Sequence, residues 1–131
     1  MKKKRILVVL GGKSKERNVS LNSGNACYEA IKRLGYKVEK FDTAHKYIDE
    51  IDKSKIDIIF NALHGKDGED GVAQSYFEHL NIPYTHSGVS SSFNAMNKII
   101  SKKIFIKNKI KTPKFFAIKK KEFNRQKFKR N

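Results

Sequence analysis

Three stretches of this sequence combine residue types that could bind a small charged molecule. In residues 11–20, two glycines are followed by the carboxylate of Glu16 and by a candidate helix start near Ser20. A carboxylate can hold an ammonium group, and the free N–H groups of a helix N-terminus attract a carboxylate or a phosphate. This stretch therefore suits a zwitterion such as an amino acid. A purely structural alternative is that Glu16 complements the helix dipole and pairs with Lys15 or Arg17.

Two common nucleotide-binding motifs do not fit residues 11–20. A phosphate-binding GxxxxGK[ST] loop that used Gly12 would need its first glycine at position 7, which is Leu7. A dinucleotide-binding GxGxxG would need glycines at positions 13 and 16, which are Lys13 and Glu16. The stretch is therefore neither of these motifs.

The other two stretches, residues 63–71 and 84–89, are rich in glycine, serine and histidine. Acidic residues follow His64, but their spacing matches neither a zinc set nor an EF-hand loop, so no metal site is predicted. We interpret His64 as a hydrogen-bonding partner of a bound ligand; the alternative is a turn that caps the next helix. Lys98 could approach an anion held by residues 84–89, or it could be one of many solvated lysines.

Hydrophobic patterns predict an alternating order of strands and helices that would position these stretches. The predicted strands are residues 5–10, 36–41, 56–61, 82–85 and 114–118. The predicted helices are residues 20–34, which Gly35 would end, a short polar helix at 43–53, residues 72–80 and residues 96–109. This order predicts an α/β fold with an open, mostly parallel Rossmann-like sheet flanked by helices. Ligands bind such sheets at the carboxyl ends of the strands, where the three stretches lie.

Composition limits the classes of function. The formal net charge of +16 is concentrated in residues 97–131, which carry 14 basic residues and one acidic residue, while residues 1–96 carry only +3. Lysine outnumbers arginine by 24 to 5, although nucleic-acid recognition favours arginine, so polyanion binding is kept only as an alternative. The single Cys27 excludes an internal disulfide, and no apolar run is long enough for a membrane helix or a signal peptide. A cytoplasmic protein is predicted.

Taken together, the three stretches resemble the N-terminal domain of the D-alanine–D-alanine ligases, members of the ATP-grasp superfamily. The matching patterns are LGGxSxERxVSLxSG at residues 10–24, LHGxxGEDG at 63–71, and PYTxSGV at 83–89, followed by Met96 and Lys98. The resemblance extends over residues 4 to about 123. It departs at Asn18, where the family often has Glu, and at Asn97, where Asp usually precedes the lysine.

The resemblance implies a reaction that joins two D-alanines for peptidoglycan synthesis through an acyl phosphate made with ATP. It implies that Glu16 is catalytic and binds the ammonium of the first D-alanine, and that Val19, Ser20, His64 and Gly65 also contact this substrate. It also implies that Lys98 points toward the ATP phosphates.

The same resemblance predicts the domain organisation. Residues 1–112 would form the first-substrate domain, and residues 113–131 would begin an ATP-grasp central domain that is cut off. ATP and magnesium would be bound mainly by the missing domains, so the chain alone would be inactive. A homodimer is expected, and neither nucleic acid nor a membrane is an expected partner. The alternative function is a stand-alone module that binds an amino acid or a small anion.

Overall fold

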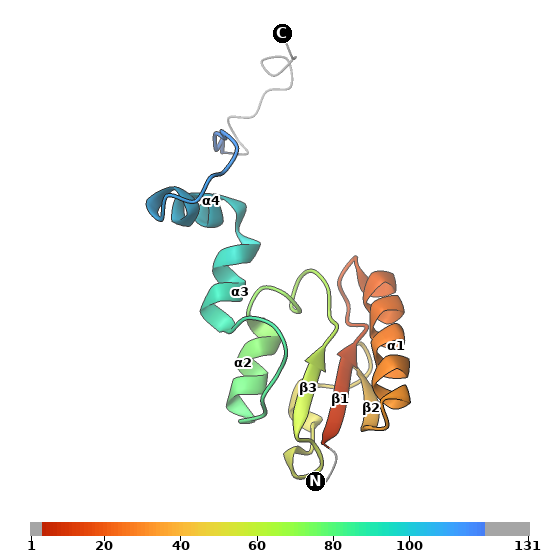
Figure 1. The fold of residues 1–131 in the computed structure, drawn as a ribbon. Coiled ribbons are helices and arrows are strands. Elements are labelled where there is room, and N and C mark those ends of the chain that lie inside the picture. Colours follow the sequence, from red (N-terminus) through yellow and green to blue (C-terminus); the bar gives the residue numbers. More distant parts are fainter. Residues whose placement is uncertain (1–3, 120–131) are drawn as a thin grey trace. The chain divides into compact units, whose positions relative to one another are not determined.

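The computed structural model describes residues 4–119, which divide between Met96 and Asn97 into two compact units (Figure 1). The first unit is built on a parallel sheet of β1 (Arg5–Leu10), β2 (Lys37–Asp42) and β3 (Ile58–Asn61), in the order β2-β1-β3. The central strand β1 is the most apolar, and Val8 and Val9 have no exposed surface. The predicted Rossmann-like parallel sheet is therefore confirmed.

Helices cover both faces of this sheet (Figure 1). On one face, α1 (Arg17–Arg33) packs Leu21, Tyr28 and Ile31 against Val8 and Leu10 of β1. Gly35 follows this helix with a φ of +77°, as predicted for a left-handed C-terminal residue. The crossover from β1 through α1 to β2 thus buries Val8 and Leu10 on one face of β1.

The opposite face of the sheet packs against α2 (Val72–His79). Ala73 and Phe77 of α2 are completely buried there against Leu7, Val9 and Ile59. The predicted helix is present, but its buried side differs from the prediction, because Val72 and Tyr76 are 43% and 45% exposed.

Two predicted elements of the first unit are only partly formed. Residues 43–53 do not form a single helix; turns lead instead into two 3-10 segments, Ile48–Glu50 and Lys53–Lys55. The predicted strand at residues 82–85 is reduced to one parallel bridge between Tyr84 and Ile59. The bridge consists of the bonds from Ile59 N to Pro83 O, at 2.8 Å, and from Thr85 N to Ile59 O, at 3.0 Å.

The predicted helix over residues 96–109 is formed over residues 98–107, but Met96 belongs to a separate helix that the sequence analysis did not predict. The first unit ends with α3 (Val89–Met96), and the second begins with α4 (Lys98–Lys107). Asn97 lies between them with a non-helical ψ of 103°, and its Oδ1 accepts from the N–H groups of Ile99 and Ile100 at 3.1 Å each. Asn97 therefore caps α4, as an Asp at this position would.

The second unit also differs from the predicted strand at residues 114–118, which form no strand. The chain instead folds back locally, because Lys102 of α4 donates to the carbonyl of Pro113 at 3.0 Å and lies over the Phe115 ring. The remainder of the predicted central-domain start, residues 120–131, lies outside the described residues. Within residues 4–119, no helix combines the length and the apolar character needed to cross a membrane.

Candidate functional site

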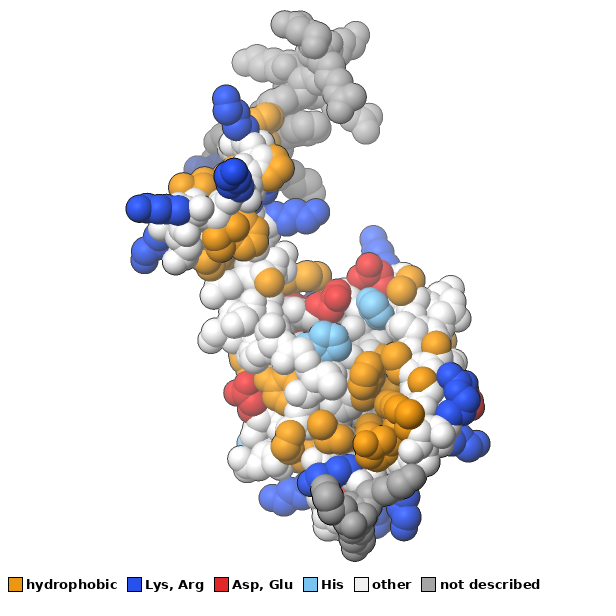
Figure 2. Space-filling model, in the orientation of Figure 1, with side chains coloured by type: hydrophobic (Ala, Val, Ile, Leu, Met, Phe, Trp, Pro, Cys, Tyr) orange, Lys and Arg blue, Asp and Glu red, His pale blue; other side chains and the backbone are white. Residues whose placement is uncertain are grey.

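The candidate site of the first unit lies at the carboxyl ends of β1 and β3, where the first two stretches meet. Figure 2 shows histidine and acidic side chains close together on the surface at this end of the sheet. The strand order reverses at this point, because β1 is the central strand and the chain places β2 on one side of it and β3 on the other. This is the position at which open parallel sheets bind ligands.

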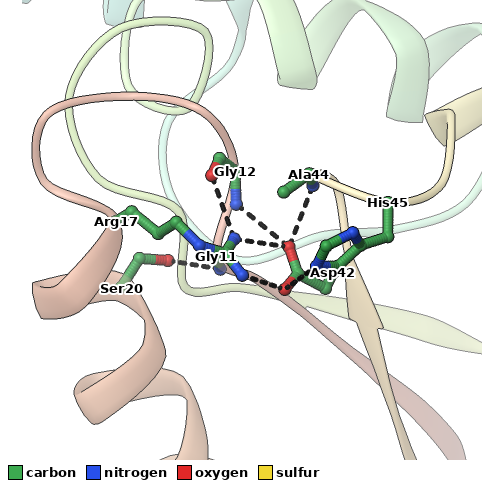
Figure 3. Close-up of polar contacts among 7 residues, drawn as sticks. All are labelled: Gly11, Gly12, Arg17, Ser20, Asp42, Ala44 and His45. Atoms are coloured by element: carbon green, nitrogen blue, oxygen red, sulfur yellow. Dashed lines mark hydrogen bonds and ion pairs between the residues drawn. The ribbon is translucent and has the colours of Figure 1, made fainter.

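Ser20 ties the loop after β1 to the loop after β3. Its side chain is fully buried; Oγ accepts from Gly11 N–H at 2.8 Å and donates to the carbonyl of Ala62 at 2.6 Å (Figure 3 shows the first of these contacts). Gly24, one helical turn farther along α1, allows this close packing, because a Cβ there would lie 2.6 Å from Leu10 Cβ. The predicted site residue Ser20 thus has its hydroxyl engaged within the protein.

An ion pair between Arg17 and Asp42 fixes the other side of the same loop (Figure 3). The guanidinium donates to both carboxylate oxygens, at 2.9 and 2.7 Å, and to the carbonyl of Gly12 at 3.0 Å. Asp42 also accepts from the N–H groups of Gly12 and Ala44. The Arg17 hydrogen bond is the main cause that lowers the pKa of Asp42 to about 2, and the same bond raises the pKa of Arg17. The loop is therefore held by charged hydrogen bonds that the sequence analysis did not predict.

Glu16 is left with its carboxylate exposed. The helix starts at Arg17 rather than near Ser20, so Glu16 occupies the N-cap position, but its side chain makes no capping hydrogen bond. Within residues 4–119, no ion pair involves Glu16, because its candidate partner Arg17 is held by Asp42. The pairing alternative with Arg17 is therefore wrong, whereas the N-cap position of Glu16 agrees with the alternative that its carboxylate complements the helix dipole.

The structure brings Glu16, His64 and Gly65 together. Ser14 Oγ accepts from Glu16 N–H at 3.1 Å and donates to the carbonyl of His64 at 2.7 Å. Gly65 has a φ of +73°, and a side chain there would collide with Oε2 of Glu16. The Glu16 carboxylate thus lies directly over the Gly65 backbone.

The buried amide side chains of Asn61 and Gln74 hold the loop that carries His64. Asn61 accepts from Leu63 N–H and donates to the carbonyl of Gly68, both at 3.1 Å, and Gln74 Nε2 donates to the same carbonyl at 2.9 Å. These residues, with His64, line a cavity of about 460 Å³ in the first unit. One feature of the sequence could have indicated that Asn61 belongs to the site, since it is a polar residue at the end of an apolar strand. No feature indicated Gln74.

The remaining predicted residues lie in separate places. Val19 is in the first turn of α1 and is 53% exposed. Lys98 is the first residue of α4 in the second unit. No group of three or more His, Cys, Asp or Glu side chains within residues 4–119 is arranged to hold a metal ion.

Comparison with known proteins shows what this chain is similar to. Residues 38–87 match the model of the family described as "D-ala D-ala ligase N-terminus". The chain is 49% identical over 128 residues to a D-alanine–D-alanine ligase of Pelagibacter ubique and 50% identical over 119 residues to one of Desulforamulus reducens. These matches cover 98% and 90% of this chain, but 40% and 38% of the relatives.

Solved structures agree with the sequence relatives. The Bacillus anthracis D-alanine–D-alanine ligase complexed with ATP superimposes with a TM-score of 0.79 at 39% identity, covering 92% of this chain and 42% of that one. A second structure of the ligase from this organism gives a TM-score of 0.74 at 41% identity, over 85% of this chain and 37% of that one. In sequence and in fold, the chain corresponds to the N-terminal region of the D-alanine–D-alanine ligases.

Proposed function

We propose that this chain is the part of a D-alanine–D-alanine ligase that binds the first D-alanine. The observation that carries the proposal is the exposed Glu16 carboxylate, which is available beside Gly65 while Arg17 is held by Asp42. A carboxylate in this position can hold the ammonium group of an amino acid. Relatives that cover the chain almost completely are named as ligases of this type.

Each residue of the site has a proposed role. Glu16 binds the ammonium, and the first turn of α1, which includes Val19, presents backbone N–H groups that lack helical partners. Ser20 fixes the loop through Gly11 and Ala62. His64 and Gly65 form the wall of the site next to Glu16.

The complete reaction needs more than this chain, which spans about two fifths of the relatives' length. In the proposed reaction, ATP phosphorylates the carboxylate of the first D-alanine, and the amine of the second D-alanine then displaces the phosphate. We propose that Lys98 faces the ATP phosphates and that magnesium is bound mainly by other domains. The proposal includes the domain division at residue 112, inactivity of the chain alone, a homodimer, and a cytoplasmic location where ATP is present.

A chimera tests the proposal. Residues 1–131 would replace the matching region of the Bacillus anthracis ligase, and D-alanyl-D-alanine formation would be measured with D-alanine and ATP. The chimera should be active. Glu16→Gln should lower kcat/KM about 10- to 100-fold, the ratio expected when a charged hydrogen bond is lost. Glu29→Gln, at an exposed position of α1, is the matched control and should have no effect.

The outcomes separate the proposal from its alternative. Equal activity of the Glu16→Gln and Glu29→Gln chimeras would refute the assigned role of Glu16. A folded but inactive wild-type chimera, combined with D-alanine binding by the 131-residue chain in calorimetry, would favour a binding module without ligase activity.

A further inference from the structure

The ring of His64 is contacted by a serine of α1 that the proposed function does not use. Ser23 Oγ lies 3.0 Å from His64 Nε2. Ser23 is one helical turn after Ser20, whose hydroxyl bonds the carbonyl of Ala62 at the end of β3. One face of α1 therefore holds both the exit of β3 and the histidine that follows it.

The contact has two possible directions, because either the serine or the imidazole can be the donor. A serine hydroxyl has one proton to donate and can accept two hydrogen bonds. Ser23 Oγ lies 3.0 Å from the carbonyl of Val19 and 3.4 Å from that of Ser20, both in its own helix. Donation to the carbonyl four residues earlier is the common arrangement of a serine inside a helix. The hydroxyl proton is thus directed along α1, and the oxygen lone pairs remain for His64.

We propose that Ser23 is a positioning residue that accepts a hydrogen bond from Nε2–H of neutral His64 and so fixes this tautomer. Nδ1 is then the unprotonated nitrogen of the ring and can only accept a hydrogen bond. Because Ser14 holds the carbonyl of the same residue, both the backbone and the ring of His64 are fixed. The ring therefore offers a hydrogen-bond acceptor at Nδ1, which favours ligands with N–H donors.

Nitrogen NMR of the 131-residue chain tests this tautomer directly. Ring ¹⁵N–¹H correlation spectra would be recorded at about pH 8, where an ordinary imidazole is neutral. The chain has four histidines, and comparison with His64→Gln assigns the His64 signals. We expect a single tautomer protonated at Nε2, with a slowly exchanging Nε2–H, whereas the exposed His79 should show averaged tautomers. Protonation of His64 at Nδ1 would overturn the proposal.

Variants test whether Ser23 is the cause. Ser23→Ala should convert His64 to averaged tautomers and speed exchange of its Nε2–H about fivefold or more, the ratio for one ordinary hydrogen bond. Ser23→Thr keeps the hydroxyl and should restore the wild-type spectrum. Ser75→Ala is the matched control, because Ser75 also donates to a carbonyl of its own helix and has no histidine beside it among the described contacts. An unchanged His64 spectrum in Ser23→Ala would contradict the role of Ser23.

Two further points keep the test decisive. If Ser23→Ala does not fold, Ser23→Cys replaces it, because sulfur is a weak acceptor of similar size and should give the same loss. A role of His64 Nδ1 in binding D-alanine rests on the proposed function, but the spectra are recorded without D-alanine. A failed ligase assay with a fixed Nε2–H tautomer would therefore count against the function alone.

Discussion

Replacing Asp42 by Asn should destabilise the first unit at neutral pH, and the difference from the wild type should shrink as the solution becomes acidic. The Asn side chain keeps the shape of Asp42 but cannot form the ion pair with Arg17, whose two bonds to the carboxylate are 2.9 and 2.7 Å long. It also weakens the acceptor for Gly12 N–H and Ala44 N–H. The loop that presents Glu16 should loosen as a result.

The magnitude follows from the pKa of Asp42, which the Arg17 hydrogen bond, above all, lowers from 3.8 to about 2. A lowering of this size corresponds to about 2 kcal/mol of unfolding free energy. Because the carboxylate side chain is 22% exposed, water screens part of the interaction and we expect about 1–2 kcal/mol. The folded pKa lies below the unfolded one, so this stability is fully present above pH 3.8 and is lost as the pH falls through about 2.

Urea unfolding followed by circular dichroism would measure this effect from about pH 7 to about pH 2. Asp52 and Asp57 also have lowered pKa values, mainly through hydrogen bonds from Ser54 and Arg5, and titrate in both proteins. The difference between wild type and Asp42→Asn therefore isolates Asp42. Asp49→Asn, at an exposed position, should show no such difference. A stability difference for Asp42→Asn that stays constant down to pH 2 would refute the electrostatic explanation.

Three other substitutions have expected outcomes. Gly65→Ala should abolish D-alanine binding in calorimetry, because the added methyl group would displace the Glu16 carboxylate. The control Gly35→Ala has a similar positive φ but open space around the added methyl group, so it should keep D-alanine binding and lose only about 1 kcal/mol of stability. Ser20→Ala leaves a buried N–H and a buried carbonyl without their partner and should cost about 1–3 kcal/mol in urea unfolding. Asn97→Ala removes the N-cap of α4 and should weaken that helix by about 1 kcal/mol, seen as smaller helical NMR shifts at its start, while Asn97→Asp should preserve them.

The central strands, and the location of Glu16 and His64 at their carboxyl ends, were predictable because the signals are local. Residues 5–10 form an apolar run that ends at glycines, and such a run is typical of a strand buried on both faces. Gly35 ends α1 as predicted, since few other residues adopt its φ of +77° at low cost. The position of Glu16 and His64 at the carboxyl ends of the strands then followed from the parallel topology.

The errors and omissions arise where tertiary contacts decide. The pattern of Met96, Ile100 and Ile104 continues across Asn97, so periodicity alone predicts one helix; the capping side chain of Asn97 ends that continuity. The Arg17–Asp42 pair joins residues 25 positions apart, and nothing in either local sequence indicates it. Residues 114–118 have the composition of a strand, but a strand requires a neighbouring ladder, and local contacts with α4 take its place in the described chain.

The two edges of the sheet bear on self-association of this chain. β2 is an edge strand, and its exposed residues include Lys37, Glu39 and Lys40. Charged side chains on an edge strand discourage the addition of a strand from a second molecule. Beyond β3, the single bridge at Tyr84 and the side-chain bond from Asn61 N–H to Thr85 Oγ1 occupy backbone groups that an incoming strand would need. Cross-β aggregation that starts from the folded sheet is therefore disfavoured at both edges, and aggregation by this route would first require these outer segments to unfold.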